Sequence, residues 1–351
     1  MPTIKDVAKR AGVGVGTVSR VITGKGFVSQ QTAKRVKKAI DALDYRPSPA
    51  ARKLQAGKSK TIGVFLPVIR GSFYAPILHN LYTVLQSRGR HMVVAFGQTV
   101  ANERQEALDG VQFLVEHGCD GLLIMATALK QRDVEKLLSL QPRLALLNRH
   151  FAQYAEMCFL PDHEAAGATA ARALWQLGHR RFAAIEGPEI SADNVLRMRG
   201  FYKELAALGA DVDGIPRFYG DFMPKGGWAG VRSLLADKTR FTALFCANDE
   251  MALGALSYLN HTGVAVPEDI SVMGYDGLDI TTYTTPPLTT IGIPWTDIVL
   301  SAVNYLLNSC YGSKLPVERN LPASVLWRGS VAAVGAAEKL PGTEGLVKSG
   351  S

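Results

Sequence analysis

The sequence predicts a small all-α head followed by a larger α/β body made of two lobes, each built on a parallel sheet. The first 60 residues hold short amphipathic helices separated by glycines, whereas from Thr61 onward short apolar runs alternate with segments of helix length. The body spans about 270 residues, which is long for one such sheet. Two lobes with a cleft between them are therefore expected.

Three helices are predicted in the head, residues 1–46. Thr3 caps the first, with an aspartate three residues later as its capping-box partner, and a Gly-Val-Gly break follows. The second helix begins at about Val15 and stops at Gly24, and Ser29 caps the third. Two short helices joined by a glycine turn and backed by a third form the helix-turn-helix pattern, which is typical of DNA-binding modules.

Residues 47–60 are expected to form a hinge helix and a linker. Pro47 and Pro49 stiffen the start of this segment, and residues 50–55 are long enough for barely two turns of helix. A helix this short is marginal in water without packing. We therefore expect it to be disordered in the free protein and helical only when it packs on a partner.

The body, residues 61–334, is predicted to alternate strands and helices. Apolar runs typical of buried strands occur at 62–66, 91–96, 121–125, 144–147, 182–185, 243–246 and 272–273, and segments of helix length include 102–117, 164–177, 194–208 and 250–261. Strands that are apolar on both faces indicate parallel sheets covered by helices. Residues 335–351 are polar and rich in glycine and are expected to be disordered.

Positive charge is concentrated in the head and hinge. Residues 1–60 hold 14 Lys and Arg against three acids, a net charge of +11. The remainder holds 25 basic and 28 acidic residues, a net charge of −3. A basic folded module indicates a polyanionic partner such as nucleic acid.

Several classes of protein are disfavoured by what the sequence lacks. It has no apolar N-terminal leader and no apolar run near the length of a membrane span, so we expect a cytoplasmic protein that does not enter a membrane. Cys119, Cys158, Cys246 and Cys310 lie far apart in apolar runs, which predicts buried reduced thiols. No G-x-S-x-G motif, Walker motif or metal-ligand spacing occurs, and no strand precedes the glycines at 12–16. No catalytic residue, metal or cofactor is therefore predicted.

Motifs occur in order along nearly the whole chain: TIKDVA at 3–8, TVSRVI at 17–22, YRP at 45–47, ARKL at 51–54, GHR at 178–180, RMRGF at 197–201, AND at 247–249, VP at 266–267, GYD at 274–276 and PPLTTI at 286–291. Together they resemble the lactose/galactose repressor family. The resemblance implies a transcription repressor that binds double-stranded operator DNA as a homodimer. It also implies a body like that of periplasmic binding proteins, with a small-molecule effector, expected to be a sugar or glycoside, bound between the lobes.

On the second helix, Arg20 is the best candidate for reading a base, because its guanidinium can donate two hydrogen bonds to guanine. The alternatives are a phosphate contact or a solvated arginine. Val15 could contact a thymine methyl, and Gly16 would let the backbone approach the duplex. The other head residues expected at the DNA are Lys5, Thr17, Ser19 and Lys34, the lysines facing phosphates unless they are only solvated helix charges.

In the hinge, the residues expected at the DNA are Ala51, Leu54 and Gln55. By resemblance, Leu54 from each of two subunits wedges into the minor groove and kinks the duplex, a known use of leucine. The alternative is that Leu54 packs against the body.

The effector residues implied by the resemblance lie mostly at the carboxyl ends of strands and the starts of helices, where open α/β sheets bind ligands. They are Phe73, Tyr74, Asn148, Asp162, Asp193, Arg197, Phe222, Asn248 and Asp276. Phe73 and Phe222 could instead be ordinary core aromatics. Asn248 and Asp249 could both cap the helix that follows them; we assign Asn248 to the cleft and Asp249 to the cap.

Two other functions are considered. A solute-binding protein of a sugar transporter would share the body, but the helix-turn-helix and the missing leader argue against it. A sugar-converting enzyme would need a general acid and base pair, and none is identified. The residues do not distinguish an inducer from a corepressor, and they do not name the operator.

Overall fold

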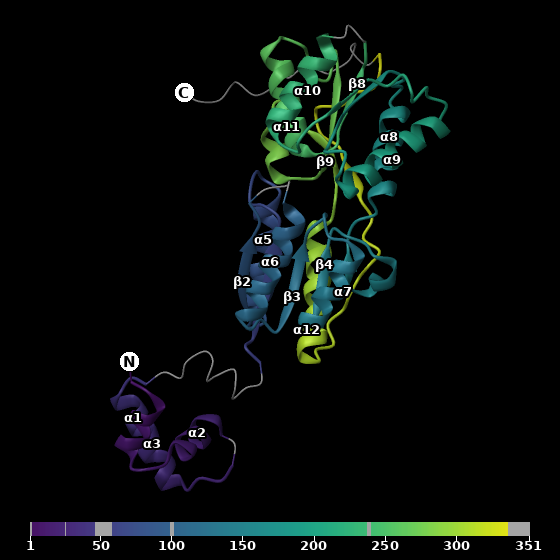
Figure 1. Cartoon of the computed structure of the whole chain (residues 1–351). Coiled ribbons are helices and arrows are strands. Elements are labelled where there is room, and N and C mark those ends of the chain that lie inside the picture. The colour runs from purple at the N-terminus through teal and green to yellow at the C-terminus, as the bar shows by residue number, and fades with distance from the viewer. Residues whose placement is uncertain (1, 25, 46–57, 99–101, 237–239, 336–351) are drawn as a thin grey trace, which may run out of the picture.

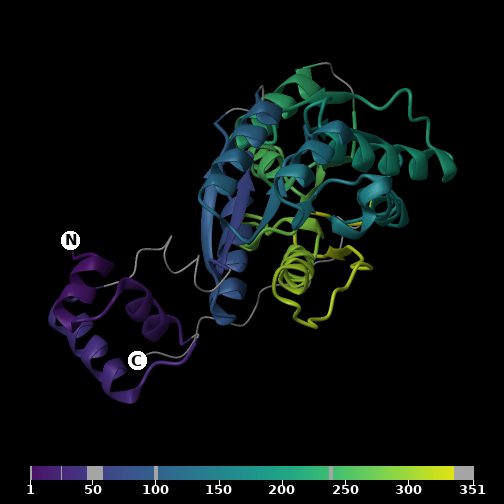
Figure 2. The same ribbon diagram turned by 60° about the horizontal axis from the view of Figure 1, so that its bottom comes forward.

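The computed structural model describes residues 2–24, 26–45, 58–98, 102–236 and 240–335. A head of helices lies apart from a body of two stacked α/β lobes (Figure 1), and the same separation is visible after rotation (Figure 2). This architecture confirms the predicted fold class. Residues 46–57, which hold most of the predicted hinge, and residues 336–351 of the tail lie outside the described residues.

The head consists of α1 (Ile4–Ala11), α2 (Val15–Thr23) and α3 (Gln30–Ala42). Thr3 donates from its backbone nitrogen and from its hydroxyl to the Asp6 carboxylate, each at 2.7 Å. Gly12 and Gly24 end the first two helices with φ of 65° and 67°, a left-handed conformation that favours glycine. The Ser29 side chain accepts a backbone hydrogen bond at the start of α3. The caps expected for the first and third helices are therefore confirmed.

The first lobe is built on a five-stranded parallel sheet in the order β2-β1-β3-β4-β5. Its elements are β1 (Thr61–Leu66), α5 (Tyr74–Ser87), β2 (His91–Phe96), α6 (Glu103–Glu116), β3 (Gly121–Met125), α7 (Gln131–Leu140), β4 (Leu144–Leu147), the 3-10 segment η1 (Ala152–Met157) and β5 (Cys158–Phe159). Strands β3 and β4 are buried along their whole length because helices cover both faces.

The second lobe is built on a six-stranded sheet in the order β11-β10-β9-β8-β6-β7, parallel except for the edge pair β10 and β11. Its elements are α8 (His163–Gln176), β6 (Phe182–Glu186), α9 (Ala192–Ala207), β7 (Arg217–Tyr219), α10 (Pro224–Ala236), β8 (Ala243–Cys246), α11 (Asp249–His261), β9 (Ser271–Asp276), the 3-10 segment η2 (Asp279–Tyr283), β10 (Thr289–Gly292) and β11 (Ser324–Leu326). Figure 1 shows α8 and α9 on one side of this sheet and α10 and α11 on the other.

Helix α12 (Trp295–Tyr311) returns the chain to the first lobe. It follows β10 in sequence but packs on α5, β3, β4 and β5, and Figure 1 shows it in yellow beside the blue elements of that lobe. The chain then runs back to the second lobe and forms β11. Three connections thus cross between the lobes, and any change in their relative orientation must be accommodated by these crossings.

Two reciprocal glycine pairs bring the helices of the second lobe into close contact. A Cβ atom at Gly167 would collide with the backbone of Arg197, and one at Gly200 would collide with the backbone of Glu164. Gly227 and Gly254 form an equivalent pair between α10 and α11. The first pair fixes α9, which carries two of the predicted effector residues, against α8.

The body confirms the predicted strand positions but contains more elements than the apolar pattern indicates. Strands β5, β7 and β11 have only two or three residues, too short for a periodic signal, and β10 (Thr289–Gly292) is also absent from the predicted strands. The four cysteines are free and buried, as expected. Across the described part of the chain, no helix has the length and apolar character needed to span a membrane.

Candidate functional site

The predicted DNA-reading residues lie on the outside of the head. Val15, Gly16 and Arg20 are exposed on α2, and Thr17 and Ser19 are half-buried on the same helix. Gly16 has open space around the position that a Cβ atom would occupy. Lys5 and Lys34 are exposed on α1 and α3. Ala51, Leu54 and Gln55 lie outside the described residues.

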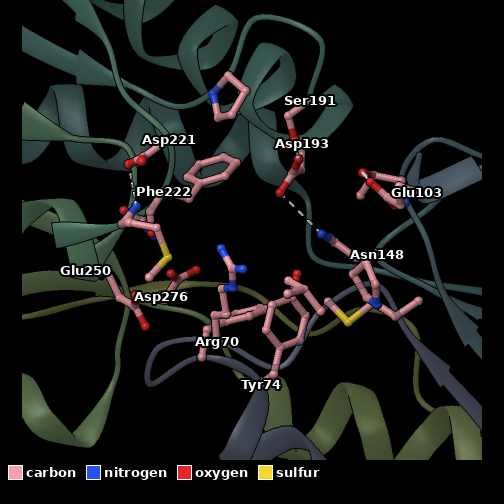
Figure 3. A pocket seen from close by; sticks show the side chains of 18 of the residues that line it. Arg70, Tyr74, Glu103, Asn148, Ser191, Asp193, Asp221, Phe222, Glu250 and Asp276 are labelled. Atoms are coloured by element: carbon pink, nitrogen blue, oxygen red, sulfur yellow. Dashed lines mark hydrogen bonds between the residues drawn. The ribbon is translucent and has the colours of Figure 1, made fainter. Parts of the chain in front are cut away.

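A cavity of about 820 Å³ lies between the two lobes. Figure 3 shows side chains of both lobes facing it. From the first lobe and α12 it is lined by Pro67, Val68, Arg70, Phe73, Tyr74, Gln98, Glu103, Met125, Thr127, Ala128, Asn148 and Trp295; from the second lobe it is lined by Pro188, Ile190, Ser191, Asp193, Arg197, Asp221, Phe222, Met223, Pro224, Lys225, Asn248, Glu250 and Asp276. Aromatic walls combined with a few converging polar groups are typical of a small-molecule site.

Arg197 is the buried cation of this cavity, with 2% of its surface exposed. Its Nη1 donates to the carbonyl oxygen of Ala247, and its Nη2 lies 3.8 Å from Oδ2 of Asp193. The guanidinium carbon lies 3.6 Å from the centre of the Tyr275 ring, a cation–π distance. Its Nε is buried without a hydrogen-bond partner among the described residues. Ala247, Asp193 and Tyr275 thus fix the position of the Arg197 guanidinium, while Nε makes no hydrogen bond to the described residues.

A chain of hydrogen bonds joins the two lobes beside Arg197. Asn148 of the first lobe donates from Nδ2 to Asp193 Oδ2 at 3.3 Å (dashed in Figure 3). The Asn148 Oδ1 atom can then only accept, so His163 Nε2, 2.7 Å away, carries the proton. The other ring nitrogen of His163 accepts from the Tyr275 hydroxyl at 2.8 Å. One tautomer of a neutral His163 satisfies the whole chain.

The charges of this network are set by burial and by Arg197. Burial, reinforced by the Arg197 cation, lowers the pKa of His163 to about 3, so the ring is neutral. Burial opposes ionisation of Asp193, but Arg197 and the hydrogen bonds that the carboxylate accepts outweigh it and lower its pKa. Asp276 is different: burial raises its pKa well above the ordinary range, and no hydrogen bond to its carboxylate comes from any residue that the structure describes.

Three cavity residues have a left-handed backbone that is uncommon for side chains other than glycine. Asn148 has a φ of 56°, Phe222 a φ of 60° and Asp276 a φ of 123°. Such strain persists only where the surroundings enforce it, and it is concentrated at functional sites. The backbone conformation at these three positions turns their side chains toward the cavity.

The start of α11 organises the rim of the cavity with three consecutive side chains. Asn248 accepts from the nitrogen of Met251 as the helix cap and donates to the carbonyl of Phe222 at 3.0 Å. Asp249 accepts from the nitrogens of Gly277 and Leu278, at 2.9 and 2.7 Å, and so fixes the loop that follows Asp276. Glu250 accepts from a backbone nitrogen of the first lobe, at Ser72.

Eight of the nine residues predicted to bind an effector line the cavity, and Asp162 does not. Asp162 is exposed and caps α8 by accepting from the nitrogen of Ala165 at 2.9 Å, so its side chain is used at the helix start and not in the cavity. The predicted cap at Asp249 is also wrong, since Asn248 caps α11 while lining the cavity. Phe73 and Phe222 pack against the core and line the cavity at once.

Several cavity residues were not predicted. Glu103, Thr127 and Trp295 stand just after strands or at helix starts, so the rule that led to the other residues would have found them. His163, the first residue of α8, does not line the cavity but hydrogen-bonds Asn148, which does. The Trp295 indole nitrogen, like Arg197 Nε, is buried without a hydrogen-bond partner among the described residues. No group of side chains within the described ranges has the composition of a metal site.

Comparison with known proteins finds a matching family for the head and another for the body. Residues 3–48 match the bacterial regulatory proteins of the lacI family, and residues 171–331 match the periplasmic binding protein-like domain. The HTH-type transcriptional regulator AscG of Escherichia coli is 31% identical and covers 95% of this chain and 99% of its own length. The ribose operon repressor of Haemophilus influenzae is 32% identical over 88% of this chain and 91% of its own length.

Solved structures agree with the sequence relatives. The lac repressor dimer bound to operator and the anti-inducer ONPF has a TM-score of 0.80 at 28% identity, covering 95% of this chain and 99% of that one. A LacI-family transcriptional regulator from Burkhoderia phymatum has a TM-score of 0.74 at 41% identity, covering 78% and 99%. With its helix-turn-helix head and two-lobed body, this chain belongs to the lacI family of bacterial regulatory proteins.

Proposed function

We propose that this protein is a transcription repressor whose affinity for operator DNA is controlled by an uncharged sugar or glycoside bound between the lobes of the body. It binds DNA as a homodimer, because one short recognition helix covers only half of a palindromic site. A regulator of this kind works at the chromosome, in the cytoplasm, and catalyses no reaction.

The observation that carries this proposal is the polar lining of the cavity. Asp276 offers a buried carboxyl group that accepts no hydrogen bond from the described residues, and Asn148, Asp193, Arg197 and Asn248 line the same space. A hydroxyl both donates and accepts, so a polyhydroxylated ligand can satisfy groups of both kinds. A negatively charged ligand is disfavoured because carboxyl groups outnumber basic groups in the lining, with Glu103, Asp193, Asp221, Glu250 and Asp276 against Arg70, Arg197 and Lys225.

The names of relatives support a small-molecule effector of this class. One similar structure is a CelR–cellobiose complex, with 30% identity and coverage of 94% of this chain. Another is a sugar-binding regulator of Escherichia coli. Purine repressors are also among the relatives, at 33% identity. Asp276 and the other carboxyl groups of the cavity favour a ligand rich in hydroxyl donors.

The linker that joins the head to the body is fixed at the end of the first lobe far from the cavity. Asp120 accepts from the nitrogens of Ser59 and Lys60, at 2.8 and 2.7 Å, and from the hydroxyl of Tyr311 at 2.8 Å. A movement of the first lobe is thereby passed to the linker. We propose that the hinge at residues 48–55 becomes helical only on operator, and hydrogen exchange with and without DNA tests this.

The test of the function begins with selection of operator sequences from duplexes with a random central segment, using the full chain. The selected duplex is then used in gel shifts with neutral sugars, glycosides, sugar phosphates and purines. A palindromic motif and a change in affinity with a neutral sugar are expected. Response only to sugar phosphates or purines would contradict the effector class, and failure to select any duplex would contradict DNA binding. Light scattering measures the dimer.

A further inference from the structure

Phe27, in the loop between α2 and α3, is 93% exposed, more than any other large apolar side chain in the described part of the chain. The small core of the head is filled by other residues, chiefly Val7, Val18 and Val36, and Phe27 does not pack against it. A single exposed apolar residue is common on protein surfaces, so its position must decide whether it has a role.

The loop places Phe27 next to the residue predicted to read a base. Gly26, with a left-handed φ of 92°, lies against the aliphatic part of Arg20: a Cβ atom there would stand 3.2 Å from the Arg20 Cδ. Phe27 follows Gly26 directly, and both Arg20 and Phe27 are exposed. The backbone that carries Phe27 therefore lies one residue from the contact with the aliphatic part of Arg20.

Exposure of large apolar side chains among the described residues of the head is confined to α2 and the loop that follows it. Among the described head residues, the large apolar side chains that are exposed are Phe27 and Val15, and Val15 is on α2 itself. Residues 2–45 also hold nine Lys and Arg against three acids. A surface that combines strong positive charge with two isolated apolar groups matches duplex DNA better than an apolar protein surface.

We propose that Phe27 is a further DNA contact, whose ring packs on the apolar surface of the duplex beside the base that Arg20 contacts. This inference rests on the proposed function. The apolar surface is supplied by thymine methyl groups or by deoxyribose. Phenylalanine is among the residues that contact thymine methyls, and apolar side chains also insert at base steps. A methyl contact would select sequence, whereas a sugar contact would add affinity only.

The test compares Phe27→Ala, Phe27→Leu and Lys34→Ala with the unmodified full-length protein on the operator selected by that protein, at several salt concentrations. Because Phe27 is exposed, its variants should unfold at the same temperature as the unmodified protein. Phe27→Ala should weaken binding by about 10-fold or more, since burying a phenylalanine contributes on this scale. The dependence of its affinity on salt should not change. Lys34→Ala should instead reduce the salt slope by about 1.

Replacing each thymine of the operator by deoxyuridine distinguishes the two apolar surfaces. If a methyl is the contact, one or two replacements weaken the unmodified protein but leave Phe27→Ala unaffected. If deoxyribose is the contact, Phe27→Ala weakens binding and no replacement does. Equal affinity of Phe27→Ala and the unmodified protein would overturn the inference, as would a loss explained by weaker dimerisation without DNA. If the unmodified protein binds no duplex, the proposed function fails instead.

Discussion

Glu250, at the start of α11 in the second lobe, accepts a hydrogen bond from the backbone nitrogen of Ser72 in the first lobe. Burial raises the pKa of this carboxyl group, although backbone hydrogen bonds from Ser72 and Phe73 oppose the shift. Gly71, with a φ of 65°, allows the approach, because a side chain there would collide with the carboxylate. One carboxylate thus holds the loop that precedes Phe73 and Tyr74 to the lobe that carries Asp276.

Glu250→Ala should loosen this loop. The Ser72 nitrogen loses its acceptor, and an unpaired buried donor costs about 1–3 kcal/mol. Amide exchange at residues 71–74, followed by mass spectrometry, should accelerate by about 10-fold or more. Glu250→Gln keeps an acceptor oxygen and should stay close to the unmodified protein. Equal exchange in all three proteins would show that Glu250 does not hold the loop.

Asp249 should make stability fall as pH rises. Burial raises its pKa to about 7, although Thr290, Leu278 and Gly277 all donate to the carboxylate. The unfolded chain has a pKa near 3.9 for this group. Between the two values the folded state binds more protons, so this contribution is fully present below about pH 4 and is lost as pH rises through about 7.

The comparison that isolates this contribution uses Asp249→Asn. The free energy of unfolding, measured in urea at about pH 5 and about pH 8, should decline less with pH in the variant than in the unmodified protein. His163, whose pKa is lowered to about 3, acts in the opposite direction in both proteins and cancels in the difference. Identical changes with pH in the two proteins would rule out Asp249 as the source.

Asp276→Asn should abolish the response of operator affinity to the effector without lowering the stability of the protein. Burial raises the pKa of Asp276 and its carboxyl group accepts no hydrogen bond from the residues described, so ionisation of this group costs the folded state stability that a neutral amide does not lose. The melting temperature at about pH 8 should therefore stay the same or rise. The change in operator affinity with the effector should be lost, while affinity without effector stays within a few-fold. A variant that still responds would show that the cavity has been wrongly assigned.

The same substitution at two helical glycines should have opposite effects. Gly200→Ala places a methyl against the backbone of Glu164 and must push α9 away from α8, which should destabilise the body by about 1–3 kcal/mol or more. Gly16→Ala adds a methyl in open space on α2, where alanine is the better helix former by about 1 kcal/mol. Thermal unfolding should show a lower melting temperature for the body in the first variant and a more stable head in the second. A tolerated Gly200→Ala would mean that the helices can separate freely.

Arg20→Ala should relax sequence choice, whereas Lys34→Ala should weaken all duplexes about equally. Losing a bidentate base contact costs about 1–3 kcal/mol at one base position. Losing a phosphate contact carries no sequence information. Repeating the operator selection with each variant measures this difference. An unchanged motif with Arg20→Ala would leave the arginine as a phosphate contact or a solvated charge.

The sequence alone determined the local structure of this protein. The cap at Thr3, the glycine stops at Gly12 and Gly24, and the apolar runs that became β1, β3 and β8 depend on residues close together in the chain. The sequence also shows which end of the chain carries the positive charge, since the excess of Lys and Arg lies in the first 60 residues. The family resemblance alone assigns Asn148, Arg197 and Asp276 to one site.

The tertiary structure decided which neighbours these residues have. His163 and Tyr275 are 112 positions apart, and only the packing of α8 against β9 and the first lobe joins them in one hydrogen-bonded chain. Asp162, one residue earlier, is exposed and caps α8, so two adjacent residues at the start of one helix differ in whether they face solvent or the buried network. Buried hydrogen bonds of this kind form between groups that only the tertiary structure brings together. Local periodicity in the sequence therefore carries no information about the partners.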